Sequence, residues 1–165
     1  MQTWNLPGPV YYRLGKDDKL LVPELAGRFE MSRCQLLGEG LDILLVAMGN
    51  VVAEAVAARD LLAAQGVNAT VAVVSCFNPS PLEHLAELLP NFKMALSIES
   101  HYLTGGVGSL VAEVIAERGI GCRLVRCGIR DMPNGVSGSQ NYLHESYGLT
   151  APTLAATALE HLSGK

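Results

Sequence analysis

The sequence predicts a three-layer α/β/α fold around a mixed, mostly parallel sheet of five strands. Short apolar runs of strand length alternate with longer helical stretches, which is typical of strand–helix–strand units. Apolar residues make up 49% of the 165 residues, enough for a buried core. Many of the 17 glycines stand where one run ends and the next begins. A chain of this length fits one compact α/β domain.

The elements follow one another in a regular order. Residues 33–37 can form a short strand, and the turn at 38–40 predicts that it runs antiparallel to the strand after it. The continuous apolar run DILLVAM at 42–48 is typical of a strand buried on both faces. Further strands are expected at 68–76, 93–98 and 121–126, and helices at 51–65, 79–90, 105–118, 139–147 and 151–162. Ser139 and Thr150 are suitable N-caps for the last two helices.

Composition excludes several classes of function. The net charge is −4 and the charges are interspersed, so the basic patch that tracks nucleic-acid phosphates is missing. No apolar run reaches the ~20 residues that span a bilayer, and the first residues do not resemble a signal peptide. Cys34, Cys76, Cys122 and Cys127 lack metal-site spacing and are expected to be free thiols. We therefore expect a cytoplasmic protein without a metal site.

One segment, 97–109, could carry chemistry. It leaves a predicted strand, passes through a polar loop and enters a helix at TGGVGS, which is where open α/β sheets usually bind ligands. Gly105, Gly106, Gly108 and Ser109 could present backbone N–H groups to a phosphate or carboxylate. The alternative is that the glycines let the helix begin close to the sheet. The sequence contains neither a complete GxGxxG nor a P-loop lysine here.

Other polar residues allow two interpretations each. Glu99 and His101 could form an acid/base pair, because alternate residues point the same way, or they could serve packing and an interface. Asp131 follows the last predicted strand and could cap a turn or meet a partner chain. His84, His144 and His161 lie on predicted helices without zinc spacing and are expected at the surface.

The order of motifs along the chain resembles the transketolase family. The segments are GPVYYRLGK, GEGLDILLVAMGN, IESHYLTGGVGSLVAEVIAERG, VRCGIRDMPNGVSGS and QNYLHESYGLTAPTL, and together they cover nearly the whole chain. The family includes transketolase, deoxyxylulose-phosphate synthase and the beta subunits of 2-oxoacid dehydrogenases. The part that the chain resembles is the C-terminal domain.

This resemblance implies a division of the chain. Residues 1–16 would be the last strand of a truncated pyrimidine-binding domain, 17–32 a linker and 33–165 the C-terminal domain. Arg13 and Lys16 match positions where relatives carry basic residues, one of which contacts a substrate phosphate. The parent enzyme would bind thiamine diphosphate and Mg²⁺, and its N-terminal thiamine-binding domains would be partners in a homodimer.

The family's cofactor-binding motif, GDG followed by NN, is not found in this sequence, and neither is the glutamate that activates the cofactor. The resemblance therefore implies a domain that binds no cofactor and is inactive alone, within an enzyme transferring two-carbon ketol units between sugar phosphates. One alternative is the partner-docking domain of a 2-oxoacid dehydrogenase beta subunit. Another is an unrelated flavodoxin-like domain that binds a small anion at 105–109.

Overall fold

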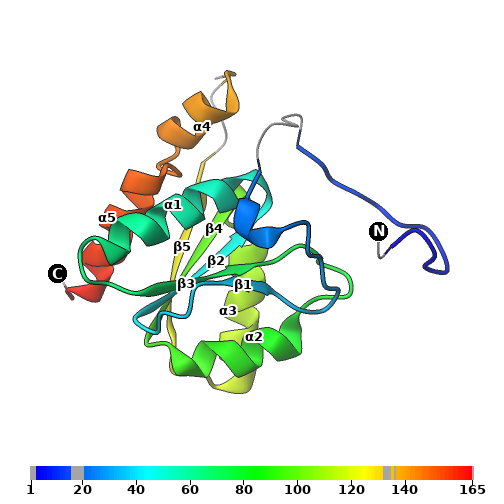
Figure 1. Ribbon diagram of the computed structural model, residues 1–165, viewed down its shortest axis with the longest axis horizontal. Helices are drawn as coiled ribbons and strands as arrows, with labels where there is room; N and C mark the ends of the chain where they lie inside the picture. The colour runs from blue at the N-terminus through cyan, green and yellow to red at the C-terminus, as the bar shows by residue number, and fades with distance from the viewer. Residues whose placement is uncertain (1–2, 16–20, 132–134, 136, 165) are drawn as a thin grey trace.

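The sheet has the predicted number of strands and the predicted mixture of strand directions. The computed structural model of the chain describes residues 3–15, 21–131, 135 and 137–164. Within them, one five-stranded sheet runs in the order β1-β3-β2-β4-β5 (Figure 1). The strands are β1 (Gln35–Leu37), β2 (Ile43–Met48), β3 (Ala69–Val73), β4 (Met94–Tyr102) and β5 (Arg123–Ile129). β1 pairs antiparallel and the other pairings are parallel, which confirms the mixed, mostly parallel sheet.

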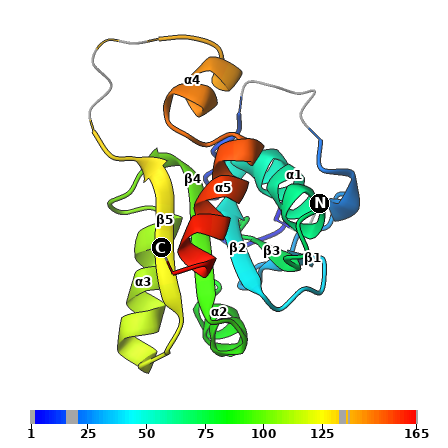
Figure 2. The same cartoon turned by 90° about the vertical axis from the view of Figure 1, so that its left-hand side faces the viewer.

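Helices cover both faces of this sheet and complete three layers (Figures 1 and 2). On one face lie α1 (Val52–Ala63) and α5 (Ala151–Leu162); on the other lie α2 (Leu82–Leu88) and α3 (Val107–Arg118). The short helix α4 (Gln140–Ser146) precedes α5, and there are 3-10 turns at η1 (Pro23–Leu25), η2 (Gly49–Val51) and η3 (Leu89–Asn91). None of the helices in the described part of the chain is long and apolar enough to cross a membrane.

β2 explains why the core has two halves. Its side chains alternate between the faces, as strand geometry requires. Ile43 and Leu45 enter the apolar cluster under α1 and α5, whereas Leu44 and Val46 enter the cluster under α2 and α3. All four are fully buried, so the continuous apolar run is correctly interpreted as a central strand.

The first strand runs in the expected direction, antiparallel to β2, but it does not lie beside β2. β3 lies between them, and Gln35 of β1 is paired with Val73 of β3. The connection after β1 passes the beginning of β3, where Gly40 packs against the Asn68 backbone and its carbonyl accepts a hydrogen bond from Thr70 at 2.7 Å. A short turn signal fixes the reversal of direction but not which strand becomes the neighbour.

Part of the predicted linker is docked on the domain. Val22 and Leu25 pack against the core under α1. The Arg59 guanidinium of α1 donates to both carboxylate oxygens of Glu24, at 2.7 and 2.8 Å, and this bidentate pair fixes the linker's direction.

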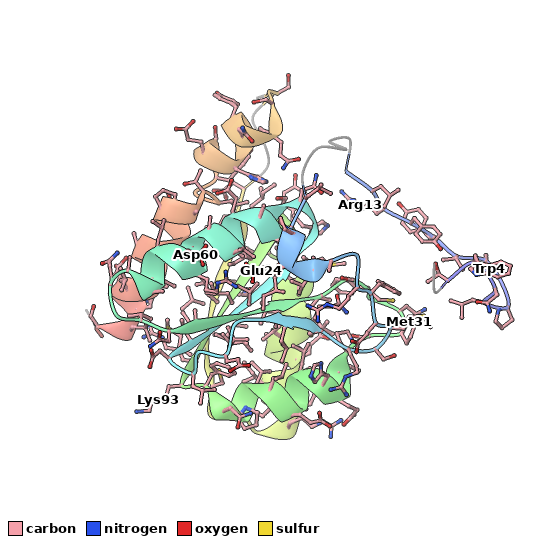
Figure 3. All side chains as sticks on the ribbon, viewed as in Figure 1. Trp4, Arg13, Glu24, Met31, Asp60 and Lys93 are labelled. Atoms are coloured by element: carbon pink, nitrogen blue, oxygen red, sulfur yellow. The ribbon has the colours of Figure 1, made fainter. Side chains whose placement is uncertain are left out.

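The N-terminal residues behave differently. Residues 3–15 contain neither helix nor strand and project away from the body as an arm, on which Trp4 and Arg13 lie (Figures 1 and 3). Trp4 is 77% exposed, Tyr11 88% and Leu14 82%. The large apolar side chains of this arm are thus exposed, whereas most of those in the folded domain are buried.

Candidate functional site

The predicted segment lies at the topological switch point of the sheet. β2 and β4 are neighbours, and Met48 at the end of β2 is paired with Glu99 of β4. The chain then turns to α1 on one face and to α3 on the other (Figure 2). In open α/β sheets this crevice beyond the carboxyl ends of the strands is the usual ligand site.

A side chain of the protein itself closes the N-terminus of α3. Glu99 Oε2 accepts a hydrogen bond from the Val107 N–H, and Oε1 accepts one from the Gly108 N–H, both at 2.9 Å. Glu99 is only 3% exposed. The N–H groups that could have held a phosphate or carboxylate are therefore occupied by an internal carboxylate.

The glycines are explained by this carboxylate. A Cβ on Gly106 would overlap Glu99 Oε2, and one on Gly108 would lie 3.0 Å from Glu99 Oε1 and 2.7 Å from Ser97 Oγ. At Gly105 the reason is the backbone conformation, because its φ of +80° lies in the left-handed region that favours glycine. Of the two predicted roles of this turn, close approach of the helix to the sheet is the one that the geometry supports.

The electrostatics of Glu99 are balanced between two effects. Burial raises the pKa of its carboxyl group above the ordinary value, because removing the charge from water is costly. The two N–H groups of α3, together with the nearby His101 and Arg126, oppose that rise. The hydrogen bonds thus hold the Glu99 carboxylate in place, although burying its charge is unfavourable.

His101 does not join Glu99 as an acid/base pair. No hydrogen bond between their side chains is found within the described residues; instead His101 Nδ1 lies 2.9 Å from the Tyr102 carbonyl oxygen. The turn that follows is closed by Ser109, whose Oγ accepts from the Gly105 N–H at 2.9 Å and donates to the Leu103 carbonyl at 3.1 Å. Polar groups of this turn therefore form hydrogen bonds with one another.

A second polar cluster lies on the other face of β4, and the sequence interpretation missed it. His144 of α4 is 4% exposed, which overturns its predicted place at the surface. Its Nε2 lies 2.8 Å from Ser100 Oγ, and its Nδ1 lies 4.0 Å from Glu54 Oε1. Glu54 Oε2 accepts a hydrogen bond from the Ala151 N–H, the first residue of α5, at 2.7 Å. β4, α4, α1 and α5 therefore meet at one joint.

Two predicted caps have different outcomes. Ser139 caps α4 as expected, since its Oγ accepts from the Tyr142 N–H at 3.2 Å. Thr150 stands at the N-cap of α5 but makes no side-chain cap; its hydroxyl bonds Thr153 instead. The capping carboxylate comes from Glu54, 97 residues away in sequence.

The remaining predicted residues are dispersed. Arg13 is exposed on the arm, and Lys16 lies outside the described residues. Asp131 is exposed just beyond β5, at the same edge of the sheet. His161 is half-buried on α5, where its Nδ1 lies 3.0 Å from an Arg123 guanidinium nitrogen. The roles assigned to Arg13, Lys16 and Asp131 stay predictions.

His84 is also buried, at 7% exposed, and its predicted surface position is wrong. Its Nδ1 accepts the Cys34 N–H at 2.9 Å, which anchors the beginning of β1. Burial lowers the pKa of His84, so a neutral ring serves as the acceptor.

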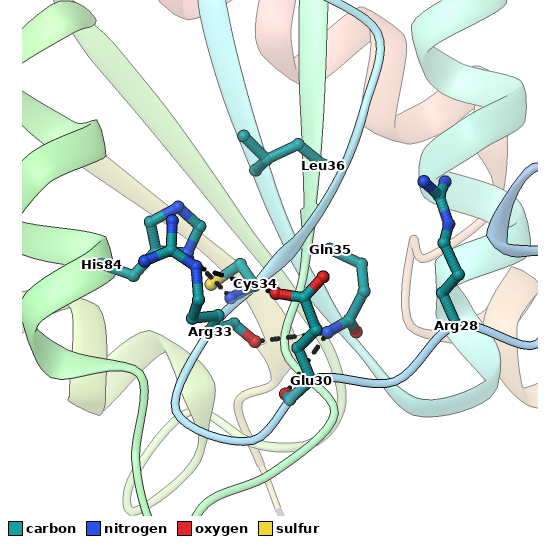
Figure 4. A pocket seen from close by; sticks show the side chains of 7 residues that line it. All are labelled: Arg28, Glu30, Arg33, Cys34, Gln35, Leu36 and His84. Carbon is teal, nitrogen blue, oxygen red and sulfur yellow. Dashed lines mark hydrogen bonds and ion pairs between the residues drawn. The ribbon is translucent and has the colours of Figure 1, made fainter.

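The His84 ring also borders a shallow cavity of about 220 Å³, together with Arg28, Glu30, Arg33, Cys34, Gln35 and Leu36 (Figure 4). Arg28 turns away from the others, towards the carbonyls of Glu24 and Leu25, so the basic groups do not converge.

Neither cysteine chemistry nor metal chemistry is supported by the described residues. All four cysteines are free. Burial raises the pKa of Cys34 to about 12 and those of Cys122 and Cys127 to about 11, so these thiols stay protonated. No group of three or more His, Cys, Asp and Glu side chains in that part of the chain is placed to hold a metal ion.

Fold and site together define an α/β/α domain whose usual ligand position is closed by its own carboxylate. The sequence profile described as "Transketolase, C-terminal domain" matches residues 32–154. The chain therefore belongs to the transketolase family and contains its C-terminal domain.

Individual relatives agree with this assignment. The chain is 38% identical over 159 residues to an apulose-4-phosphate transketolase subunit of Actinobacillus succinogenes, covering 94% of this chain and 50% of that protein. It is 33% identical to a 1-deoxy-D-xylulose-5-phosphate synthase of Heliobacterium modesticaldum, covering 93% of this chain and 24% of the relative. A solved structure of a split gene transketolase, described as an inactive β4 tetramer, superposes with a TM-score of 0.75 at 32% identity, covering 88% of this chain and 46% of that one. The chain thus spans about half the length, or less, of the relatives it matches.

Proposed function

We propose that this chain is the non-catalytic C-terminal part of a thiamine-diphosphate-dependent, transketolase-like enzyme, where it supports assembly and interdomain contacts. The observation that carries the proposal is the Glu99 carboxylate on the N-terminus of α3. In this fold an external anion would bind there, and both N–H groups are already used. The domain therefore contributes surfaces to the enzyme instead of reacting groups.

Thiamine diphosphate and Mg²⁺ would belong to the other domains of the enzyme. A Mg²⁺-bound diphosphate needs carboxylate or amide oxygens that converge on the metal, and also donors for the phosphates. The residues described here do not fit such a group, because no metal-ligand cluster is present among them and the α3 amides are engaged. We assign no step of the reaction to this chain.

The surface for the N-terminal thiamine-binding domains would include the arm. Most of its large apolar and aromatic side chains are exposed, which is typical of a segment that a partner covers. We propose that residues 1–16 complete a pyrimidine-binding domain, that 17–32 link it to the domain at 33–165, and that the enzyme is a cytoplasmic homodimer. Arg13 and Lys16 would then lie near a substrate phosphate.

The parent reaction would be two-carbon ketol transfer between sugar phosphates. The named relatives, an apulose-4-phosphate transketolase and a deoxyxylulose-phosphate synthase, favour this over partner docking in a 2-oxoacid dehydrogenase. An acyltransferase subunit-binding domain that captured the chain in a pull-down would reverse that preference.

Calorimetric titration of thiamine diphosphate with Mg²⁺ into the purified chain tests the proposal. We expect no saturable heat. The matched measurement adds the purified diphosphate-binding and pyrimidine-binding domains of a relative, and the combination should show cofactor-dependent ketol transfer. Micromolar binding of the cofactor to the chain alone would overturn the proposal.

A further inference from the structure

The joint at His144 has a feature that the proposed function does not use. His144 is the only buried residue of α4, a helix that lies entirely within the described residues. Helices in folded proteins are usually held by an apolar stripe that faces the core. Within α4 the buried anchor is instead a titratable ring, and the apolar contacts of Tyr147 and Leu149 with the core begin only after the helix ends. The attachment of the helix itself therefore depends on the protonation state of that ring.

We propose that His144 makes α4 an acid-releasable element: the neutral imidazole docks the helix to the sheet edge, and its protonation detaches the helix. The inference concerns a conformational device within this domain and does not depend on the parent enzyme's reaction.

The neutral ring fits its surroundings. Ser100 Oγ, at 2.8 Å from Nε2, can donate to or accept from the ring, and this hydrogen bond joins α4 to β4. The bond therefore survives either neutral tautomer. A buried neutral imidazole with one such bond is a satisfactory anchor.

The protonated ring does not fit as well. Both ring nitrogens would then donate, and Nδ1 would need an acceptor where the nearest carboxylate oxygen, Glu54 Oε1, is 4.0 Å away. A charge-assisted hydrogen bond is about 2.7–2.9 Å long, so a gap of about 1 Å would have to close. The other oxygen of Glu54 is held by the Ala151 N–H at 2.7 Å, so moving this carboxylate would weaken the cap of α5.

The groups that surround the ring agree with this conclusion. The polar groups that face the ring in the described part of the chain are Glu54 from α1 and the neutral Ser100 from β4. α5 acts on the ring only indirectly, through the Ala151 N–H that Glu54 accepts. Burial lowers the pKa of His144, and the attraction of Glu54 only partly opposes this. Charging the ring in place is thus unfavourable, and moving it into water is the alternative.

Few other side-chain hydrogen bonds hold α4. Besides that of His144, one further bond connects α4 with η2 among the described residues: Asn50 Nδ2 donates to Gln140 Oε1 at 2.9 Å. A single part-buried bond between neutral groups contributes only about 1 kcal/mol, which does not hold a helix in place. Loss of the histidine anchor would therefore free the seven-residue helix up to its C-terminal end, where Tyr147 and Leu149 still pack against the core.

NMR relaxation measurements on the backbone amides of residues 140–146 at pH 7.5 and at a pH below the titration of the His144 ring test the proposal. We expect order parameters near 0.85 at the higher pH and below about 0.6 at the lower, the ranges of rigid and flexible backbone. The midpoint of the change should coincide with the titration of the His144 ring, followed through its own signals.

Three variants separate this device from general acid instability. His144→Gln keeps a hydrogen-bonding partner for Ser100 but cannot titrate, so α4 should have the same order at both pH values. Glu54→Gln removes the charge that favours the protonated ring, and should move the midpoint to lower pH. His161→Gln, on α5, should leave the response of the unaltered protein unchanged. An α4 that stays ordered while His144 titrates, or a His144→Gln protein that loses order equally, would overturn the inference.

Discussion

Two helices of this domain begin at carboxylates that come from elsewhere in the chain, and the two arrangements differ. At α3, Glu99 is almost fully buried and uses both oxygens on two backbone N–H groups. At α5, Glu54 is partly exposed, uses one oxygen on the Ala151 N–H and directs the other towards a histidine at 4.0 Å. The first terminus is closed and packed; the second retains an ionisable partner.

This difference indicates separate roles for the two faces of the sheet at the carboxyl ends of its strands. A site whose donors are all engaged resists change, because any motion leaves buried N–H groups without partners. A joint with a titratable ring and an incomplete ion pair can respond to its environment. The α3 side thus provides rigidity, and the α4–α5 side provides the element that can move.

The largest expected effect is that of Glu99→Ala. It leaves the Val107 and Gly108 N–H groups buried without acceptors and should lower the free energy of unfolding by about 2–4 kcal/mol. Urea denaturation would measure this. The same variant should be partly restored by formate or acetate, because a small carboxylate can enter the vacated position. A variant as stable as the unaltered protein would show that the internal carboxylate does not stabilise this terminus.

Gly106→Ala tests the same terminus from the other side. The added methyl group overlaps Glu99 Oε2 and should displace the carboxylate, at a cost of about 1–3 kcal/mol. Gly121→Ala is the matched control, since a Cβ there meets nothing within 4 Å. Equal thermal stability of the two variants would contradict the close packing described here.

Glu54→Ala should have a smaller effect than Glu99→Ala. It removes one N-terminal acceptor from a partly exposed position, and such a cap contributes about 1 kcal/mol. The measurement is again the urea midpoint, compared with that of Glu99→Ala. A larger loss of stability in Glu54→Ala than in Glu99→Ala would contradict the conclusion that the α3 terminus depends more strongly on its carboxylate.

The smallest effects are pH slopes of opposite sign. Glu99 has a pKa raised above its ordinary 4.5, so the pH-dependent part of its contribution is complete below 4.5 and is lost as the pH rises through the folded-state value, while the hydrogen bonds to α3 remain. His144 has a pKa lowered below 6.5, so its contribution is complete above 6.5 and is lost as the pH falls through the folded-state value. Unfolding free energies across pH 4–8 should lose the first slope in Glu99→Gln and the second in His144→Gln.

The sequence interpretation succeeded wherever local periodicity decides the outcome. Alternating apolar runs predicted the strands and helices because each element must present its apolar side chains with its own period. It predicted the direction of β1 without its neighbour, and it failed for the burial of His84 and His144, since polar side chains on short helices look exposed until a distant partner is known. It recognised Glu99 and the glycine turn as belonging together but not that the carboxylate would occupy the turn.

By itself, the sequence determined the fold class, the family and the edge of the sheet where polar residues gather. The periodicity of apolar side chains and the order of motifs are local properties of the chain, and they require no knowledge of contacts. Only the tertiary structure decided which donors meet which acceptors. Glu99 meets Val107 because a loop returns to its strand, whereas Glu54 meets Ala151 across 97 residues of sequence. Such pairings depend on how packed layers place distant segments side by side, which no local pattern encodes.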